Sequence, residues 1–446
     1  MEIEVISRQS IKPSSPTPIH LKIYKLSLLD QLMPSAHVPM IFFYGRIDLL
    51  EIPARLQTLK QSLSEALTSF YPFAGKVKDD LYIDCNDDGV SYIEAKVNCC
   101  LSDILKQPDR EKEAMFKLLP GDFGSSGTPV AMIQVNVFNC GGIAIGTKTS
   151  HKIIDGPTST AFLKAWAAIA RGTTTTTPTP RFEPSFVAPS LFPQNDSLPK
   201  AASLAIWPSL IKFGKGVTKR FVFYASAVAE LKSRASSTSF VAHPTRVEAV
   251  SAFIWQCTMV ASKAKNGHQK PSVLSLIVNL RGKKNTHLPE NSIGNLLWMA
   301  SAESSADSGK ELSFLVGILR ESILKINGEY VQKLSGKDGF FRVCECLQEF
   351  GDLYGNPGSD YLTFSSLCKV GIYETDFGWG KPIWVSPGGG VYGPFFQNLL
   401  FLNDTSVGDG IEAWLTLDEQ DMDVLESESQ ILSFASLNPS PLELCN

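Results

Sequence analysis

The chain has 446 residues, of which 43% are hydrophobic and 19% are charged, and its formal net charge is −4. A chain of this length can bury substantial cores and is expected to divide into two domains. Its small negative charge gives no long-range attraction to nucleic acid or to an anionic membrane surface, so we expect neither as a partner.

The N-terminal residues and the cysteines bear on the cellular compartment. The first residues are acidic where a secretory signal is basic, and no run of about 18 apolar residues occurs, which predicts a cytosolic protein without a membrane span. Nine cysteines are scattered without a Cys-x-x-Cys pair. We therefore expect reduced thiols and no metal site.

The first helix is predicted between Arg55 and Phe70, where apolar residues recur at steps of three and four. Residues 81–84 then have strand character, a turn-like stretch follows at Asn86–Gly89, and a second strand is expected at 91–97. This pattern predicts a β-hairpin.

Two more strands are predicted between residues 130 and 150, because apolar residues alternate at 133–137 and again at 143–145. His151 follows the second strand. Pro157 marks the first turn of a helix that ends at Arg171-Gly172. The predicted unit is a strand, a loop that carries a histidine, and a helix.

Residues 173–214 form an expected interdomain crossover, since the segment opens on five consecutive threonines and is rich in proline. Beyond it, 221–223 has strand character, and Thr245 and Glu248 have the spacing of a capping box that opens a helix. We predict an α/β fold with mixed sheets, with an N-terminal domain at 1–172 and a C-terminal domain at 215–446.

His151 is the only one of the six histidines followed by an aspartate four residues later, Asp155. One interpretation is a loop histidine near a helix cap, without chemistry of its own. The other is a general base, because an imidazole with a pKa of about 6.5 is mostly neutral at cytosolic pH and can accept a proton from a hydroxyl. Gly156 and Pro157 favour the second interpretation, since they predict a tight turn that holds the ring in place.

A second motif, Asp-Phe-Gly-Trp-Gly at 376–380, is far more specific than the first. The two motifs, in this order and at this separation, resemble those of the plant BAHD acyltransferases. Stretches at 26–30, 70–75, 278–281 and 410–414 resemble further landmarks of the family in the same order. The chain is most similar to the branch of that family that mostly uses acetyl-CoA.

The resemblance implies two similar α/β domains of the coenzyme A acyltransferase type, with a tunnel between them. Acyl-CoA, most often acetyl-CoA, enters one side as co-substrate, an alcohol enters the other, and the protein acts as a monomer. His151 takes the acceptor proton while the oxygen attacks the thioester, with no acyl-enzyme.

The resemblance also places the other motif residues. Asp155 and Asp376 complete the catalytic motifs with His151. We expect Asp155 to point away from His151 and to form a buried pair with Arg281. Asp376 is expected to shape its own turn, together with Gly378, Trp379 and Gly380.

Lys219 and Lys283 either belong to a solvated surface or contact the phosphates of coenzyme A, and Ser365 and Ser366 are further candidates for contacts with coenzyme A. The sequence Ser-Ser-Leu-Cys-Lys at 365–369 departs from the Ser-Ser-Trp followed by arginine that relatives often carry. The acceptor class therefore stays open among alkaloid, terpenoid and volatile alcohols and sugars, the last two with longer acyl-CoAs. Two rival interpretations are a peptide-synthetase condensation domain and a catalytically silent member that binds a metabolite.

Overall fold

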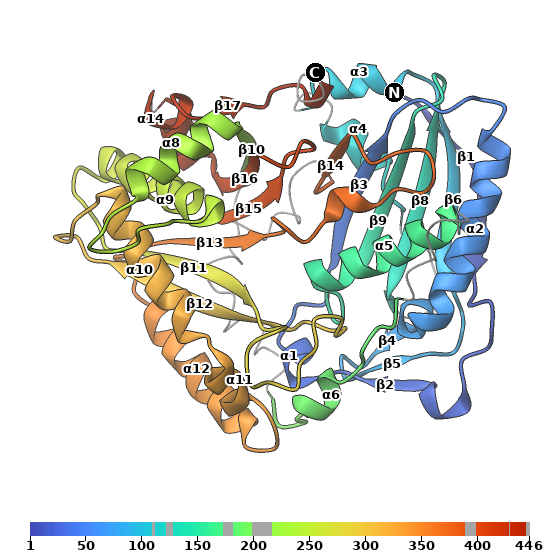
Figure 1. Cartoon of the computed structure of the whole chain (residues 1–446), viewed down its shortest axis with the longest axis horizontal. Coiled ribbons are helices and arrows are strands. Elements are labelled where there is room, and N and C mark those ends of the chain that lie inside the picture. The colour runs from blue at the N-terminus through green and yellow to red at the C-terminus, as the bar shows by residue number, and fades with distance from the viewer. Residues whose placement is uncertain are drawn as a thin grey trace.

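The computed structural model describes residues 1–108, 112–121, 128–172, 182–198, 216–388, 398–427 and 429–442. Two large mixed sheets lie beside each other, one with its helices on the right of Figure 1 and one with its helices on the left. The predicted α/β fold with mixed sheets is confirmed. Most of the predicted crossover lies outside the described residues.

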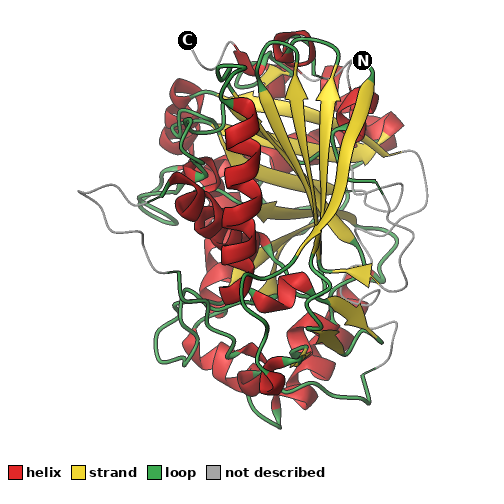
Figure 2. Cartoon of the chain, turned by 90° about the vertical axis from the view of Figure 1, so that its right-hand side faces the viewer, coloured by secondary structure: helices red, strands yellow, loops and turns green. Residues whose placement is uncertain are grey.

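Among the described residues the first sheet has six strands, and of their pairings only β6–β8 is parallel. Figure 2 shows these strands fanned by their twist beside a long helix. In sheet order the strands are β1 (Ile3–Ile11), β6 (Val90–Val97), β8 (Ala131–Phe138), β9 (Ile143–Ser150), β3 (His37–Tyr44) and β14 (Trp384–Ser386).

Helices α2 (Ile52–Ser69) and α5 (Gly156–Arg171) pack against each other beside this sheet. The indole Nε1 of Trp166 donates to the carbonyl of Leu59 at 3.0 Å, which joins the two helices. Helix α2 begins three residues before the predicted start, because Pro53 fits a first helical turn, where its missing N–H costs nothing.

The predicted hairpin at 81–97 is wrong, because its two strands belong to different sheets. Strand β5 (Tyr82–Asp84) joins β2 (Ile23–Lys25), β4 (Lys76–Lys78) and β7 (Thr128–Pro129) in a four-stranded sheet, whereas β6 pairs with β1 and β8. The turn between β5 and β6 is bound to another part of the chain, because the Asp87 carboxylate accepts from the Thr17 hydroxyl at 2.6 Å. Gly89, at φ +94°, lies so close to the carbonyl of Ile11 that no larger residue fits.

Within the part of the chain that the structure describes, the second large sheet has seven strands. In sheet order they are β12 (Leu297–Ser304), β11 (Ser272–Asn279), β13 (Asp360–Ser366), β15 (Leu399–Asp404), β16 (Ile411–Asp418), β10 (Gly216–Phe223) and β17 (Ser436–Leu437).

Helix α9 (Arg246–Asn266) is the central helix against this sheet, and the predicted capping box is present. The Thr245 hydroxyl accepts from the Glu248 amide at 3.2 Å, and the Glu248 carboxylate accepts from the Thr245 amide at 2.8 Å. The neighbouring helices are α8 (Ala225–Ala235), α10 (Leu312–Lys325) and α13 (Glu419–Ser427).

The remaining elements are short or lie at the edges. They are η1 (Ile19–Leu21), α1 (Leu28–Gln31), η2 (Tyr71–Ala74), α3 (Leu101–Leu105), α4 (Lys112–Lys117), α6 (Ala188–Leu191), α11 (Gly328–Leu334), α12 (Gly339–Tyr354), η3 (Ile372–Glu374) and α14 (Ser429–Leu432). Within the described ranges, no helix is both long and apolar enough to span a bilayer.

The two halves of the chain exchange elements. Strand β14, from the C-terminal half, is an edge strand of the six-stranded sheet, where Trp384 pairs with Phe43 of β3. In the other direction, Leu28 and Leu29 of α1 are buried in the core of the seven-stranded sheet. These exchanges bring residues from both halves to the space between the sheets.

Candidate active site

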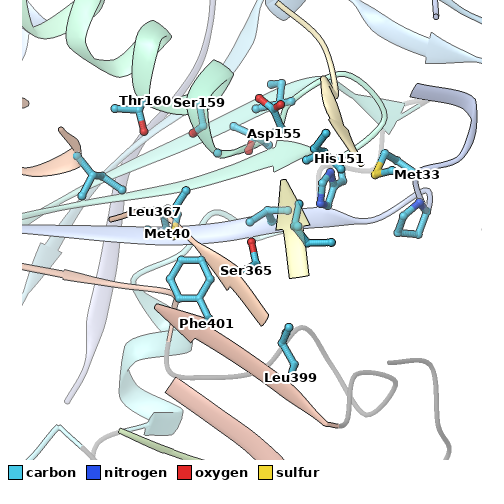
Figure 3. A pocket seen from close by; sticks show the side chains of 18 of the residues that line it. Met33, Met40, His151, Asp155, Ser159, Thr160, Ser365, Leu367, Leu399 and Phe401 are labelled. Carbon is cyan, nitrogen blue, oxygen red and sulfur yellow. The ribbon is translucent and has the colours of Figure 1, made fainter. Parts of the chain in front are cut away.

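A cavity lies between the two large sheets, with about 1050 Å³ of empty space, part of it open to solvent. Its walls come from β3 and β9 on one side and from β11, β12, β13 and β15 on the other. Apolar side chains such as Met33, Met40, Leu367 and Phe401 line most of it, and His151 reaches it from the loop after β9 (Figure 3).

The loop that carries His151 is fixed at both ends. The His151 amide donates to the carbonyl of Ala36 at 2.8 Å. Asp155 is the N-cap of α5, and its Oδ1 accepts from the Thr158 amide at 2.9 Å. Ile153 and Ile154 between them are buried, so the loop has little freedom to move. The sequence expectation of a tight turn into the helix is confirmed.

Asn295 determines which ring nitrogen of His151 carries the proton. Its Nδ2 donates to the carbonyl of His151 at 2.7 Å and to Oδ1 of Asp30 at 2.9 Å, which uses both amide hydrogens. Its Oδ1 lies 3.1 Å from Nδ1 of His151 and can only accept. Nδ1 is therefore protonated, and the free lone pair is on Nε2.

Burial lowers the pKa of His151 below its usual value of 6.5, because the apolar surroundings disfavour the charged ring. Asn295, Asp155 and Asp30 act in the opposite direction but do not outweigh burial. The imidazole is thus neutral at neutral pH and can accept a proton.

Asp155 does not contact His151. Its carboxylate forms a bidentate pair with Arg281, with Nη1–Oδ2 at 2.8 Å and Nη2–Oδ1 at 3.0 Å, and it also accepts from the amide of Leu296 at 3.1 Å. Both side chains are buried, with 1% and 3% of their surfaces exposed. In Figure 3 the carboxylate and the imidazole point in different directions. The predicted pairing of Asp155 with Arg281 is confirmed.

Asp376 acts on its own loop. Its Oδ1 accepts from the amides of Gly378 at 2.8 Å and Gly380 at 3.0 Å. Gly378 has φ +99°, which strains other residues. Trp379 stacks on Phe377 at 5.6 Å. None of these residues is among the described residues that line the cavity.

Of the four expected coenzyme A contacts, Ser365 alone is among the described residues that line the cavity. Ser365 lines the cavity, whereas the Ser366 hydroxyl accepts from the amide of Cys368 at 3.1 Å. Lys219 forms an ion pair with Glu426 at 3.1 Å. Lys283 is half-buried, and burial lowers the pKa of its ammonium group. Neither lysine is among the described residues that line the cavity.

No local pattern pointed to Asn295, which lies 144 positions from His151 along the chain. Asp30 belongs to the stretch at 26–30 that resembles the family, but nothing there assigned it to the site. No group of three or more metal-ligating side chains occurs in the part of the chain that the structure describes.

Comparison with known proteins identifies the family of the chain. Residues 1–432 match the model of the Transferase family. The limonoid 7-O-acetyltransferase of Citrus sinensis is 44% identical over 99% of this chain and 100% of its own length. The epi-neemfruitin B 7-O-acetyltransferase of Melia azedarach is 43% identical over the same shares.

The crystal structure of vinorine synthase, a protein of Rauvolfia serpentina, is similar in fold and sequence. It superposes with a TM-score of 0.80 at 34% identity and covers 98% of this chain and 99% of its own. The chain therefore belongs to the Transferase family, the plant BAHD acyltransferases, and is an acyl-CoA-dependent O-acyltransferase.

Proposed function

We propose that this enzyme transfers an acetyl group from acetyl-CoA to a hydroxyl of a polycyclic terpenoid alcohol, with Nε2 of His151 as the general base. The observation that carries the proposal is the bond from Nδ1 of His151 to Asn295 at 3.1 Å, which leaves the Nε2 lone pair free at an apolar cavity. Acetyl transfer is supported by the two relatives named as 7-O-acetyltransferases.

The reaction needs one proton relay. Nε2 accepts the hydroxyl proton while the acceptor oxygen attacks the thioester carbonyl, which forms the new C–O bond and a tetrahedral oxyanion. The C–S bond then breaks, and the imidazolium returns the proton to the departing thiolate. Asp155 and Arg281 hold the loop from behind and take no proton. The hydroxyl of Ser365 lies at the cavity and is a candidate to donate to the oxyanion.

The lining of the cavity supports a bulky apolar acceptor over a sugar. Apolar side chains dominate it, and buried apolar walls cannot satisfy the many hydroxyls of a sugar. Leu367 stands where relatives often carry tryptophan and packs against Gly156, so this wall is formed by a smaller side chain. A rigid ring system can use the extra space.

The test is a matrix of donors and acceptors. Purified enzyme is mixed with acetyl-CoA, butanoyl-CoA or benzoyl-CoA and with a triterpenoid secondary alcohol, an alkaloid alcohol, hexanol or glucose. Thiol release gives the rate and mass spectrometry identifies the ester. We expect the largest kcat/KM with acetyl-CoA and the triterpenoid, and a value at least about 100-fold lower with His151→Ala. An equal kcat/KM with hexanol, or a preference for the longer donors, contradicts the proposed substrates.

Several expectations about the whole protein also stand as proposals. The enzyme acts as a cytosolic monomer with domains at 1–172 and 215–446, and Lys283 contacts a phosphate of coenzyme A. The partial burial of Lys283 supports this contact, because a bound phosphate would compensate its charge. Lys219 is a weaker candidate, since Glu426 already pairs with it. Gel filtration and the KM for acetyl-CoA of Lys283→Ala and Lys219→Ala test these points.

A further inference from the structure

The side chain of Asn295 is held on both sides, by His151 toward the cavity and by Asp30 away from it. Both the backbone amide and Nδ2 of Asn295 donate to Oδ1 of Asp30, at 2.7 and 2.9 Å. Asp30 belongs to α1 in the N-terminal half, while Asn295 precedes β12 in the C-terminal half. The contact therefore spans the two halves directly behind the histidine.

Asp30 is fully buried, and donors surround its carboxylate. Its other oxygen, Oδ2, accepts from the amide of Ser27 at 2.9 Å and from the hydroxyl of Ser27 at 2.7 Å. Four donors thus occupy the lone pairs of the two carboxylate oxygens. The Asp30 carboxylate can therefore only accept hydrogen bonds from Asn295 and cannot donate one. Burial raises the pKa of Asp30, and these four hydrogen bonds oppose that rise.

This arrangement determines the orientation of the Asn295 amide. If the amide turned over, its Oδ1 would face the Asp30 carboxylate and the carbonyl of His151, and each contact would set two acceptors together. Its NH₂ group would then face Nδ1 of His151, which would have to give up its proton. The hydrogen would move to Nε2, where it would block the lone pair that faces the cavity.

We propose that Asp30 is a positioning residue that holds the Nδ1–H tautomer of His151 by fixing the amide of Asn295. The proposal rests on the proposed role of His151 as the base. This role differs from a merely structural role of Asp30 in one respect. A change at Asp30 must alter the tautomer of His151, and it must do so through Asn295. It also makes the protonation of the base depend on a contact between the two halves of the chain.

The direct test is the state of the His151 ring. In enzyme labelled with ¹⁵N-histidine, the shifts of the two ring nitrogens tell which one carries the hydrogen, and His151→Gln identifies the signal. We expect a single Nδ1–H tautomer in the wild type at neutral pH. A wild-type signal from Nε2–H overturns the proposal, and this measurement needs no Asp30 variant to fold and no substrate.

Asp30→Asn keeps the size of the side chain but offers an NH₂ group that can donate to the turned Oδ1 of Asn295. We expect a mixture of tautomers and a kcat lowered by roughly 10- to 100-fold, because a misplaced proton disables the base. The KM for acetyl-CoA should change less than twofold. A single Nδ1–H tautomer together with an unchanged kcat contradicts the proposal.

A double-mutant cycle shows whether Asp30 acts through Asn295. In the Asn295→Ala background, Asp30→Asn should lower kcat by less than twofold, since no amide remains to be held. Multiplicative losses contradict the proposal. Ser27→Ala is the matched control: it removes one hydrogen bond to Asp30 and the cap of α1 but keeps Asn295 bound, so the tautomer and kcat should stay within twofold of the wild type.

Failure of this inference and failure of the proposed function are distinguishable. If His151→Ala abolishes turnover while Asp30→Asn leaves the ring unchanged, His151 is the base and Asp30 is only structural. If the ring responds to Asp30→Asn but His151→Ala keeps its activity, the tautomer is controlled as proposed and His151 is not the base.

Discussion

Two of the buried ion pairs lie in different parts of the molecule. The pair of Asp155 with Arg281 lies behind the loop that carries His151, and the pair of Arg220 with Glu412, at 3.1 Å, lies on neighbouring strands of the seven-stranded sheet. Both are buried, but their surroundings differ.

The first pair is surrounded by hydrogen bonds. Arg281 also donates to the carbonyls of Ser292, at 2.8 Å, and Gly294, at 2.9 Å, and to the hydroxyl of Thr158, at 2.9 Å. These partners make the geometry of the pair rigid, which suits a group that supports the loop that carries His151.

The second pair is surrounded mainly by aromatic rings. The guanidinium of Arg220 lies 5.0 Å from the ring of Trp384 and 5.7 Å from that of Trp414. Glu412 accepts from Nε1 of Trp384 at 3.2 Å. Burial raises the pKa of Glu412, so Arg220 compensates its charge only in part. The comparison teaches that the Asp155–Arg281 pair holds the loop that carries His151 in one orientation. The Arg220–Glu412 pair anchors the exchanged strand β14.

His151→Ala removes the chemistry without disturbing either pair, and it has the largest expected effect. General-base catalysis typically contributes 10²–10⁴-fold, so kcat should fall at least about 100-fold. Thermal unfolding and the affinity for acetyl-CoA should stay near the wild type, because the ring acts on the acceptor and not on the donor, and its loss breaks one hydrogen bond, to Asn295. A residual rate above about one tenth of the wild type contradicts a role as base.

Asp155→Ala leaves Arg281 buried without a counter-charge, which typically costs about 3–5 kcal/mol of unfolding free energy. Arg281→Ala should cost a similar amount, and the double variant should be less damaged than the sum of the two. Urea unfolding of the three variants gives the coupling. Fully additive losses would mean that the pair does not act as a unit.

Glu412→Gln tests the pair that is surrounded by aromatic rings. We expect a smaller loss, about 3 kcal/mol at the lower end of the range for a broken buried pair, because glutamine keeps a side-chain oxygen that can still accept from Arg220. The kcat of the folded fraction should match the wild type, measured beside Asp155→Ala as the matched variant. A loss of kcat in Glu412→Gln without unfolding would place both pairs in the same role.

Asp376→Ala removes two hydrogen bonds that hold the loop of the second motif. We expect a loss of about 1–2 kcal/mol of stability, since these bonds go to a partly exposed carboxylate. Activity should fall only as far as the folded fraction falls. Calorimetry and initial rates on the same preparation check this, and an unchanged melting temperature with a lost rate would place Asp376 in the chemistry.

The fall of the rate at low pH should depend on the His151 ring and not on the Arg220–Glu412 pair. Because burial lowers the pKa of His151, the active neutral ring persists to a pH below 6.5. kcat/KM for the acceptor should therefore be flat at neutral pH and fall about tenfold per pH unit once the pH drops below that pKa. Glu412→Gln should leave this limb in place, since it does not contact the loop. A limb centred above 6.5 contradicts the assignment to His151.

Local patterns predicted the elements near the site well. The strand, loop and helix around His151 were legible because alternation, a cap and a proline are encoded within about 30 residues. The pairing of Asp155 with Arg281 came from family resemblance, because no local pattern links residues 126 positions apart. Asn295 was missed for the same physical reason: its role depends on a fold that brings a loop of the other half to His151.

The hairpin at 81–97 failed because alternation identifies strands but not their partners. A short turn normally joins neighbouring strands of one sheet, and here the side chain of Asp87 is bound by Thr17 and Lys22 from another part of the chain. The sequence also did not predict that β14 joins the six-stranded sheet, since nothing in its three residues indicates which sheet they pair with.

The position of β14 also determines when the six-stranded sheet can be completed during synthesis. When the ribosome has released only the N-terminal half, β3 is still an open edge, with the backbone groups that later face Trp384–Ser386 unpaired. The six-stranded sheet is completed only after more than 200 further residues have been translated. Until then the nascent chain presents an apolar edge that can pair with other chains, so an incomplete chain is more prone to aggregate than the finished enzyme.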